Sequence, residues 1–232
     1  MRNRGINKLT LITFCLFVYL PLLLTPNVTI DPVNPGKLLL FVVAGCLSFY
    51  LVLRVGIPQD LKMLLTVLGA FFILGVSVTL FFSGAPMQQQ IFGTWGRNIG
   101  LLAYMACFAA LLFGAMLYQK LPEKILKNSF FLCFALSITY GLFQAVGIDF
   151  VNWSYPDVFG SLGNINFYSA HLAIIASVLI GYWVGSTSSK FERICIAVTL
   201  IPILFLLYKS NSLQGFIIFG VSVLLAIHIS IS

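Results

Sequence analysis

Long runs of apolar residues, separated by short polar connections, are the dominant pattern along the chain. Most runs are close to the roughly 20 residues that an α-helix needs to cross the hydrocarbon core of a bilayer. The connections hold the proline, glycine and charged residues that are typical of breaks between helices. The pattern therefore predicts an all-α, polytopic transmembrane helical bundle that forms a single domain, residues 1–232. Its eight spans are expected at about 9–24, 37–53, 62–82, 98–118, 128–147, 165–185, 194–208 and 213–231.

The first apolar run could also be the core of a secretory signal peptide, because it follows a basic segment. A signal peptide would end in a small-residue cleavage site, but here the chain continues through a polar stretch into a second apolar run. We therefore interpret residues 9–24 as an uncleaved span. Pro21 and Pro202 fall inside predicted spans, where a kink is tolerated if neighbouring helices satisfy the freed carbonyl groups.

The composition leaves no room for a separate soluble domain. Of the 232 residues, 60% are hydrophobic and 8% are charged. A water-soluble domain of this length cannot bury so much apolar surface. The formal net charge of +7 does not indicate nucleic-acid binding, because the basic residues are scattered singly and form no stripe.

The 13 basic residues predict the orientation of the chain in the membrane. With the N-terminus inside, ten of them lie on the inner side of the eight spans and three on the outer side, as the positive-inside rule requires. We therefore expect a cytoplasmic N-terminus. The inner residues are Arg2, Arg4, Lys8, Arg54, Lys62, Lys120, Lys124, Lys127, Lys190 and Arg193, and the outer residues are Lys37, Arg97 and Lys209.

A polar stretch at residues 159–168, with the sequence FGSLGNINFY, precedes and opens the sixth span on the predicted outer side. Gly160 and Gly163 permit tight turns and close approach of the backbone. Asn164 and Asn166 offer amide donors and acceptors at the mouth of the helix. Polar groups at this depth are candidates for ligand binding.

A polar stripe continues from this stretch along the span. With a helix that begins near Asn164, the side chains of Asn164, Tyr168 and His171 follow i, i+4, i+7 and share one face, which we expect to contact protein or water instead of lipid. A lone intramembrane histidine is more often a hydrogen-bonded packing residue than a catalyst. This applies to His171 and to His228 in the last span.

Two cations lie at outer ends of spans. Arg97, at the start of the fourth span, can bind a phosphate or diphosphate through a bidentate fork; the alternative is an anchor at the headgroup level. Lys209, followed by Ser210, Asn211 and Ser212, can provide a second phosphate or sugar contact; the alternative is a tight helical hairpin.

The remaining polar residues show no recognisable catalytic pattern. Asp149 and Asp157 lie in the same loop, but their spacing does not indicate a carboxylate pair, and we expect them to solvate the loop. The five cysteines form no CxxC pair and have no metal-ligand spacing to histidine or carboxylate. The sequence therefore predicts neither a metal site nor a cofactor, and it identifies no catalytic residue.

Three segments resemble the O-antigen ligase and polymerase superfamily of bacterial envelope glycan enzymes. Residues 92–104 contain Gly-Thr-Trp-Gly-Arg-Asn-Ile-Gly and are similar to the family's G-x-y-x-R-x-x-G-l segment. Residues 159–168 are similar to its f-G-t-l-G-N-P-N-f segment, with Ile165 in place of the proline. Residues 210–216 resemble a serine-containing motif, with Leu213 and Gln214 where many members have an arginine.

The resemblance implies transfer of a glycan from an undecaprenyl-diphosphate donor to a hydroxyl of a glycan, lipid or protein acceptor. The location would be the outer face of the bacterial cytoplasmic (inner) membrane, as in lipopolysaccharide biosynthesis. The substrate-binding residues would be Arg97, Lys209, Asn164, Asn166, Tyr168 and His171. The resemblance covers the family's N-terminal half only, so we expect the chain to be the N-terminal part of a longer ligase-like glycosyltransferase, without the family's large outer loop that bears a histidine.

Two other classes of protein are compatible with the pattern. A transporter or flippase-like permease would explain a polar stripe and kinked helices around a site near the midplane. However, the candidate side chains gather at one predicted membrane face, and the spans hold no charged residue at mid-depth for ion coupling. A non-catalytic membrane scaffold is the third alternative.

Overall fold

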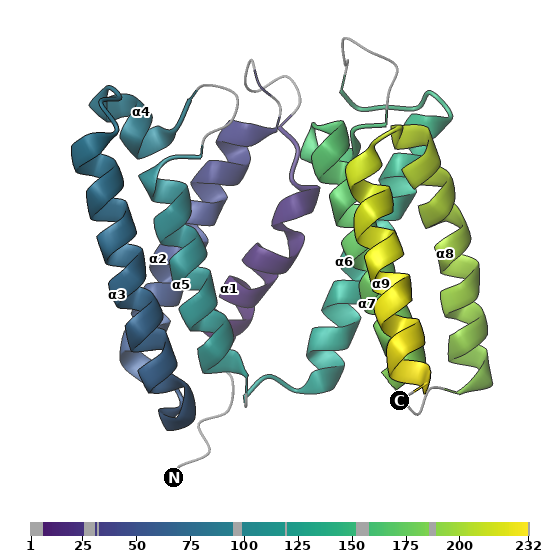
Figure 1. The fold of residues 1–232 in the computed structure, drawn as a ribbon, viewed down its shortest axis with the longest axis horizontal. Helices are drawn as coiled ribbons and strands as arrows, with labels where there is room; N and C mark the ends of the chain where they lie inside the picture. Colours follow the sequence, from purple (N-terminus) through teal and green to yellow (C-terminus); the bar gives the residue numbers. More distant parts are fainter. Residues whose placement is uncertain are drawn as a thin grey trace. The chain divides into compact units, whose positions relative to one another are not determined.

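The computed structural model describes residues 7–25, 31, 33–94, 99–118, 120–151, 158–185 and 189–231. Within these residues every regular element is a helix, which confirms the all-α prediction for this part of the chain (Figure 1). The chain divides into two compact units, Met1–Phe130 (unit 1) and Phe131–Ser232 (unit 2), and each is described by itself.

Helices occupy all eight ranges in which the sequence predicts spans. The α-helices are α1 (Lys8–Tyr19), α2 (Asn34–Val55), α3 (Gln59–Phe82), α4 (Met87–Phe92), α5 (Leu101–Leu117), α6 (Glu123–Ala145), α7 (Ile165–Gly185), α8 (Lys190–Ser210) and α9 (Leu213–Ile231), and two short 3-10 helices are η1 (Leu20–Leu22) and η2 (Gly160–Leu162). The short α4 was not predicted. Pro21 does not kink a longer helix but lies in η1, directly after the end of α1.

Five of the described helices, α2, α3, α6, α7 and α8, are long and apolar enough to cross a membrane. The apolar helices Lys8–Leu22, Leu101–Leu117 and Leu213–Ile229 are shorter. Large apolar side chains point outward, such as Phe81 and Phe82 at the end of α3, which are 84% and 82% exposed. These helices are compatible with a multi-pass membrane protein. The count of eight spans and the cytoplasmic N-terminus remain predictions.

Unit 1 is organised around the contact between α2 and α5. A Cβ atom on Gly45 of α2 would lie only 3.0 Å from the Cα atom of Ala106 of α5, so the two backbones approach as closely as small residues permit. α3 meets α5 where the ring of Phe72 stacks on that of Phe108, with 4.6 Å between the centroids. α4 lies against the start of α5 (Figure 1).

Unit 2 is organised around α7, which contacts both α8 and α9. The core of this unit consists of fully buried apolar side chains from α7 and α8, with further residues from α6. These residues include Tyr168, Leu172 and Ile175 of α7, Ile203, Leu206 and Leu207 of α8, and Phe134 and Ile138 of α6. α7 is therefore the helix on which the rest of the unit packs.

Serine pairs join α7 to α9. The hydroxyl of Ser169 donates to that of Ser212 at 2.8 Å, and the hydroxyls of Ser177 and Ser222 are hydrogen-bonded at 2.5 Å. In an apolar environment such bonds between helices contribute about 0.6 kcal/mol each on average. Since the two pairs lie roughly two turns apart on α7, they fix the register of α9 along α7.

α8 has clear start and stop signals. Ser189 and Glu192 form a capping box at its start, in which each side chain accepts a hydrogen bond from the other residue's backbone N–H. The helix continues through Pro202, as predicted, and ends at Asn211, whose φ of 50° is the left-handed conformation of a helix C-cap. This turn reverses the direction of the chain into α9. Residues 209–215 thus form a tight helical hairpin, which is one of the two possibilities given for them above.

Candidate functional site

Asn164 is the N-cap of α7. Its Oδ1 accepts hydrogen bonds from the backbone N–H groups of Asn166 at 2.9 Å and Phe167 at 3.3 Å. These are the second and third residues of the helix, the positions that an N-cap side chain satisfies. The side chain is exposed, so its Nδ2 group remains on the surface at the start of the helix.

The capping role predicts how substitutions at residue 164 affect stability. Asn164→Asp and Asn164→Ser retain an acceptor for the same N–H groups, and we expect the thermal unfolding temperature in detergent to stay within a degree or two of the parent's. Asn164→Ala leaves these donors unsatisfied and is expected to lose about 1 kcal/mol. Equal unfolding temperatures for the alanine and serine variants would show that the cap contributes nothing.

Asn166 connects α7 to the hairpin between α8 and α9. Its Oδ1 accepts a hydrogen bond of 2.9 Å from the hydroxyl of Ser212, which in turn accepts one of 2.8 Å from the hydroxyl of Ser169. Ser169 and Ser212 are buried, whereas Asn166 is exposed. Two of the three segments that carry the family resemblance, 159–168 and 210–216, are thus in direct contact.

A glycine allows this contact. A Cβ atom on Gly215 of α9 would lie 2.8 Å from Cβ and 2.9 Å from the carbonyl oxygen of Ser169, and 2.7 Å from Leu207 Cδ2. Distances below 3.0 Å are not found for real side chains, so the start of α9 can approach α7 only because residue 215 has no side chain.

Tyr168 does not line a surface, because its side chain is fully buried at 0% exposure. Its hydroxyl donates a hydrogen bond of 2.9 Å to the carbonyl oxygen of Ser137 in α6. The ring lies against two glycines, Gly141 of α6 and Gly160 of η2, and at both positions a Cβ atom would overlap the tyrosine. Tyr168 therefore locks the turn at 160–163 between α6 and α7.

A second network, which the sequence analysis missed, holds the same turn from the end of α6. The carboxylate of Asp149 accepts hydrogen bonds from the hydroxyl of Tyr140 at 2.5 Å, from Gln144 Nε2 at 2.6 Å and from the backbone N–H of Val151 at 3.0 Å. Gln144 Oε1 accepts one of 2.7 Å from the backbone N–H of Gly160. The expectation that Asp149 merely solvates its loop is therefore wrong, since this carboxylate organises the loop.

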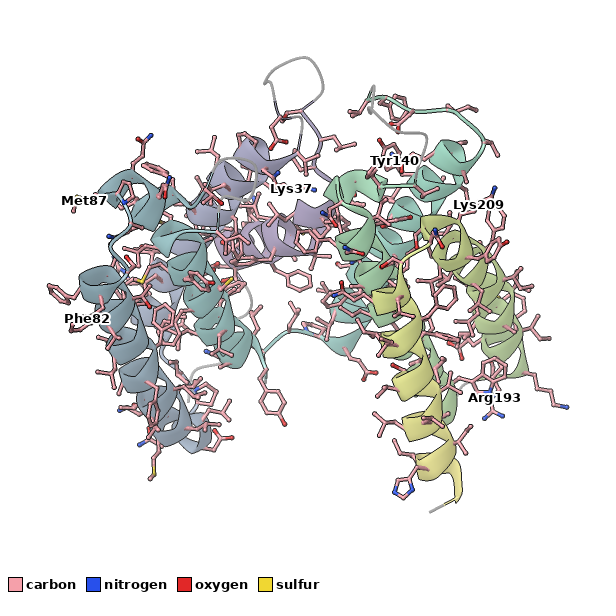
Figure 2. All side chains as sticks on the ribbon, turned by 45° about the horizontal axis from the view of Figure 1, so that its top comes forward. Lys37, Phe82, Met87, Tyr140, Arg193 and Lys209 are labelled. Carbon is pink, nitrogen blue, oxygen red and sulfur yellow. The ribbon has the colours of Figure 1, made fainter. Side chains whose placement is uncertain are left out.

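The remaining predicted site residues lie apart from these networks or outside the described residues. Lys209 is exposed at the end of α8 (Figure 2). Its Nζ lies 5.9 Å from the ring centroid of Phe205 on the same helix. His171 is half-buried on α7. Arg97 and Asp157 lie outside the described residues.

Taken together, the residues at this end of unit 2 provide polar groups held in fixed orientations. Because Asn164 and Asn166 both use their side-chain oxygens internally, their amide N–H groups remain to donate to a ligand, and Lys209 adds a positive charge near the same hairpin. Donors and a cation suit a ligand that is rich in acceptor oxygens, such as a phosphate or a sugar. No cluster of three or more possible metal ligands occurs among the residues that the structure describes.

Comparisons with known proteins add no further assignment. No protein-family model, curated protein or solved structure matches the chain.

Proposed function

We propose that this protein takes part in transferring a glycan from an undecaprenyl-diphosphate carrier to an acceptor hydroxyl on the outer face of a bacterial cytoplasmic membrane. In this proposal the chain crosses the membrane eight times, with the N-terminus inside. Because the leaving group is a lipid diphosphate, the protein needs chiefly to hold its charge and to orient the acceptor hydroxyl.

The observation that supports the proposal most directly is the hydrogen bond between Asn166 and Ser212. These residues are 46 positions apart, in two different segments that resemble the same family of glycan enzymes. A shared binding site would require such segments to meet. In the proposed roles, Asn164 and Asn166 donate to oxygens of the donor, Lys209 contributes charge, and Tyr168 fixes the turn that carries the asparagines. Arg97, in the remaining segment 92–104, is the proposed diphosphate-binding residue. His171, farther along the same face of the helix as Asn164, is proposed as an additional substrate-binding residue.

A serine comparison tests the proposal. Ser212→Ala and Ser222→Ala each remove one hydroxyl that bonds α9 to α7, but only Ser212 also bonds Asn166. We expect Ser212→Ala to lower glycan transfer in cells by about five- to thirtyfold, because a lost hydrogen bond to an oriented group corresponds to roughly 1 to 2 kcal/mol. Ser222→Ala is expected to keep transfer within about twofold of the parent.

Transfer would be followed as surface glycan on cells that depend on this protein, with protein levels matched by immunoblot. Equal loss in the two variants would reduce the role of Ser212 to helix packing. The variants would be made in the chromosomal gene, so that the protein carries every segment that the cell gives it. No transfer by this native protein under any donor supply would reject the proposed function itself.

A further inference from the structure

We propose that one end of unit 1 binds the headgroups of anionic phospholipids and selects them over zwitterionic ones. This end, which we call the basic end, comprises residues 53–64, where α2 is followed by α3, and residues 118–127, where α5 is followed by α6. The inference requires only that the protein lies in a membrane. It goes beyond the proposed glycan transfer and does not depend on it.

The packing of unit 1 brings these two segments to the same end. Ser83, which follows α3, and Gly100, which precedes α5, line one groove, so the end of α3 lies beside the start of α5. The two helices are therefore antiparallel, and the start of α3 lies at the level of the end of α5. Only residues 56–58 separate α2 from α3, so the end of α2 is there as well. Figure 1 shows these helix ends together at the lower end of the unit.

The basic end carries an excess of positive charge. Its two segments contain five basic and two acidic residues, a formal net charge of +3. Within the described part of the chain, no ion pair involves its four exposed cations, which are Arg54, Lys62, Lys120 and Lys124. At the opposite end of the unit, the charged residues that the structure describes are Asp31 and Lys37, whose charges cancel. The described residues of that end thus offer no comparable excess.

The cations lie at the depth expected for lipid headgroups. Residues 63–82 of α3 include no charged residue and rise about 30 Å, the thickness of a hydrocarbon core, and Lys62 directly precedes them. From the contact between Gly45 and Ala106, Arg54 lies about 14 Å farther along α2, and the end of α5 lies about 17 Å farther along α5. The charges carried by these helices therefore end at a similar level.

Apolar side chains next to the cations favour a lipid over an acidic protein or a nucleic acid. Leu53 and Met63, each adjacent in sequence to a cation, are 71% and 81% exposed. Tyr118 is exposed at the end of α5, and the guanidinium of Arg54 lies 5.5 Å from the ring centroid of Tyr50. Tyrosines beside basic residues are typical of the membrane interface. A partner for this surface must present negative charge directly above hydrocarbon, as an anionic leaflet does.

The test measures lipid binding by native mass spectrometry, on protein expressed from its full native gene and purified in a non-ionic detergent. The probes are phosphatidylglycerol, which is anionic, and phosphatidylcholine, which is zwitterionic. We expect the parent protein to bind phosphatidylglycerol about tenfold or more tightly than phosphatidylcholine, and this preference to shrink as the ammonium acetate concentration rises. Glycerol phosphate, which carries the phosphate without hydrocarbon, should not displace the lipid.

Charge substitutions at exposed positions locate the site. Combined Arg54→Gln, Lys120→Gln and Lys124→Gln should weaken binding of phosphatidylglycerol by about tenfold or more and leave phosphatidylcholine unaffected. Combined Asp60→Asn and Glu123→Gln should strengthen it by about threefold or more, because they raise the charge of the same end. Lys209→Gln is the control, since it removes an exposed lysine from a helix end in unit 2, and it should keep binding within about twofold of the parent.

Equal affinity of the parent for the two lipids would overturn the inference, and so would unchanged phosphatidylglycerol binding in the triple variant. A loss in Lys209→Gln as large as that in the triple variant would show that any surface charge suffices, and would reject the basic end as a site. Displacement by glycerol phosphate would assign the charges to a free phosphate ligand instead of a lipid. If the triple variant fails to fold, the variant without Asp60 and Glu123 decides, because no gain in its binding would reject the inference.

Discussion

Gly141→Ala is expected to lower the free energy of unfolding of the protein by about 2 to 3 kcal/mol. The new methyl group would overlap the hydroxyl of Tyr168 and would lie 2.9 Å from Cζ of the same ring and 3.2 Å from Leu206 Cδ1. Tyr168 cannot move aside easily, because it is fully buried and hydrogen-bonded to the carbonyl oxygen of Ser137. Overpacking at such a site forces shifts of the backbone or of strained rotamers.

Gly181→Ala is the control for this substitution. Gly181 lies inside α7, and a Cβ atom there meets nothing within 4 Å. Alanine is favoured over glycine in a helix by about 1 kcal/mol, so this variant should be as stable as the parent or slightly more stable. Both variants would be compared by thermal unfolding in the same detergent. If Gly141→Ala unfolds at the same temperature as Gly181→Ala, the packing of Tyr168 against α6 is not as the structure has it.

The same overlap predicts a coupling between two substitutions. Tyr168→Phe alone loses the hydrogen bond to Ser137 and should cost about 1 kcal/mol. Because the hydroxyl is the atom that the methyl group of Gly141→Ala would overlap most, the cost of Gly141→Ala should fall by about 1 kcal/mol in the Tyr168→Phe background. Additive effects in this double-mutant cycle would contradict the proposed contact.

The positions of the helices could be predicted from the sequence because each apolar run must satisfy its backbone hydrogen bonds within itself. The exception is α4, which consists of only six residues and follows Pro86. A helix of this length carries no periodic pattern, and its sequence MQQQIF lies within a stretch expected to be a connection. A helix of six residues is marginal by itself, and α4 packs against the start of α5.

The site could be predicted only in part. The capping role of Asn164 is visible in the sequence, since asparagine before an apolar helical run is a common N-cap. The bond between Asn166 and Ser212 could not be derived from spacing, because residues 46 positions apart meet only through the packing of α7, α8 and α9. The resemblance of both segments to one family implies a shared binding site, but it does not name this pair of side chains.

Asp149 shows why loop residues are easily misread. Its partners Tyr140 and Gln144 lie in the last turns of α6, nine and five positions earlier. They belong to a predicted span in which most residues are apolar, so neither residue stands out. The signal was present, since a tyrosine and a glutamine spaced i, i+4 at the end of a span place two donors on one face.

The role of Arg97 stays a prediction, because this residue lies outside the described part of the chain.

Gly215→Ala is expected to lower the free energy of unfolding of the protein by about 3 kcal/mol. The methyl group would meet the backbone carbonyl of Ser169 as well as side chains on either side, and a backbone atom cannot move without shifting α7. Gly220→Ala, in the same helix and with nothing within 4 Å of the added atom, should be neutral. Thermal unfolding in detergent compares the two.

A local readout separates a displaced α9 from general weakening of the fold. Ser210 is 2% exposed beside the hairpin, so a Ser210→Cys reporter, with the native cysteines replaced, should resist a water-soluble thiol reagent in the parent and with Gly220→Ala. With Gly215→Ala, α9 must move away from Ser169 and break the bonds that Ser212 makes, and the reporter should react faster by tenfold or more below the unfolding temperature. If the thiol stays protected although the protein is less stable, the strain is absorbed elsewhere and Asn166 keeps its partner. The proposed function then predicts that glycan transfer survives in Gly215→Ala at temperatures where the protein remains folded.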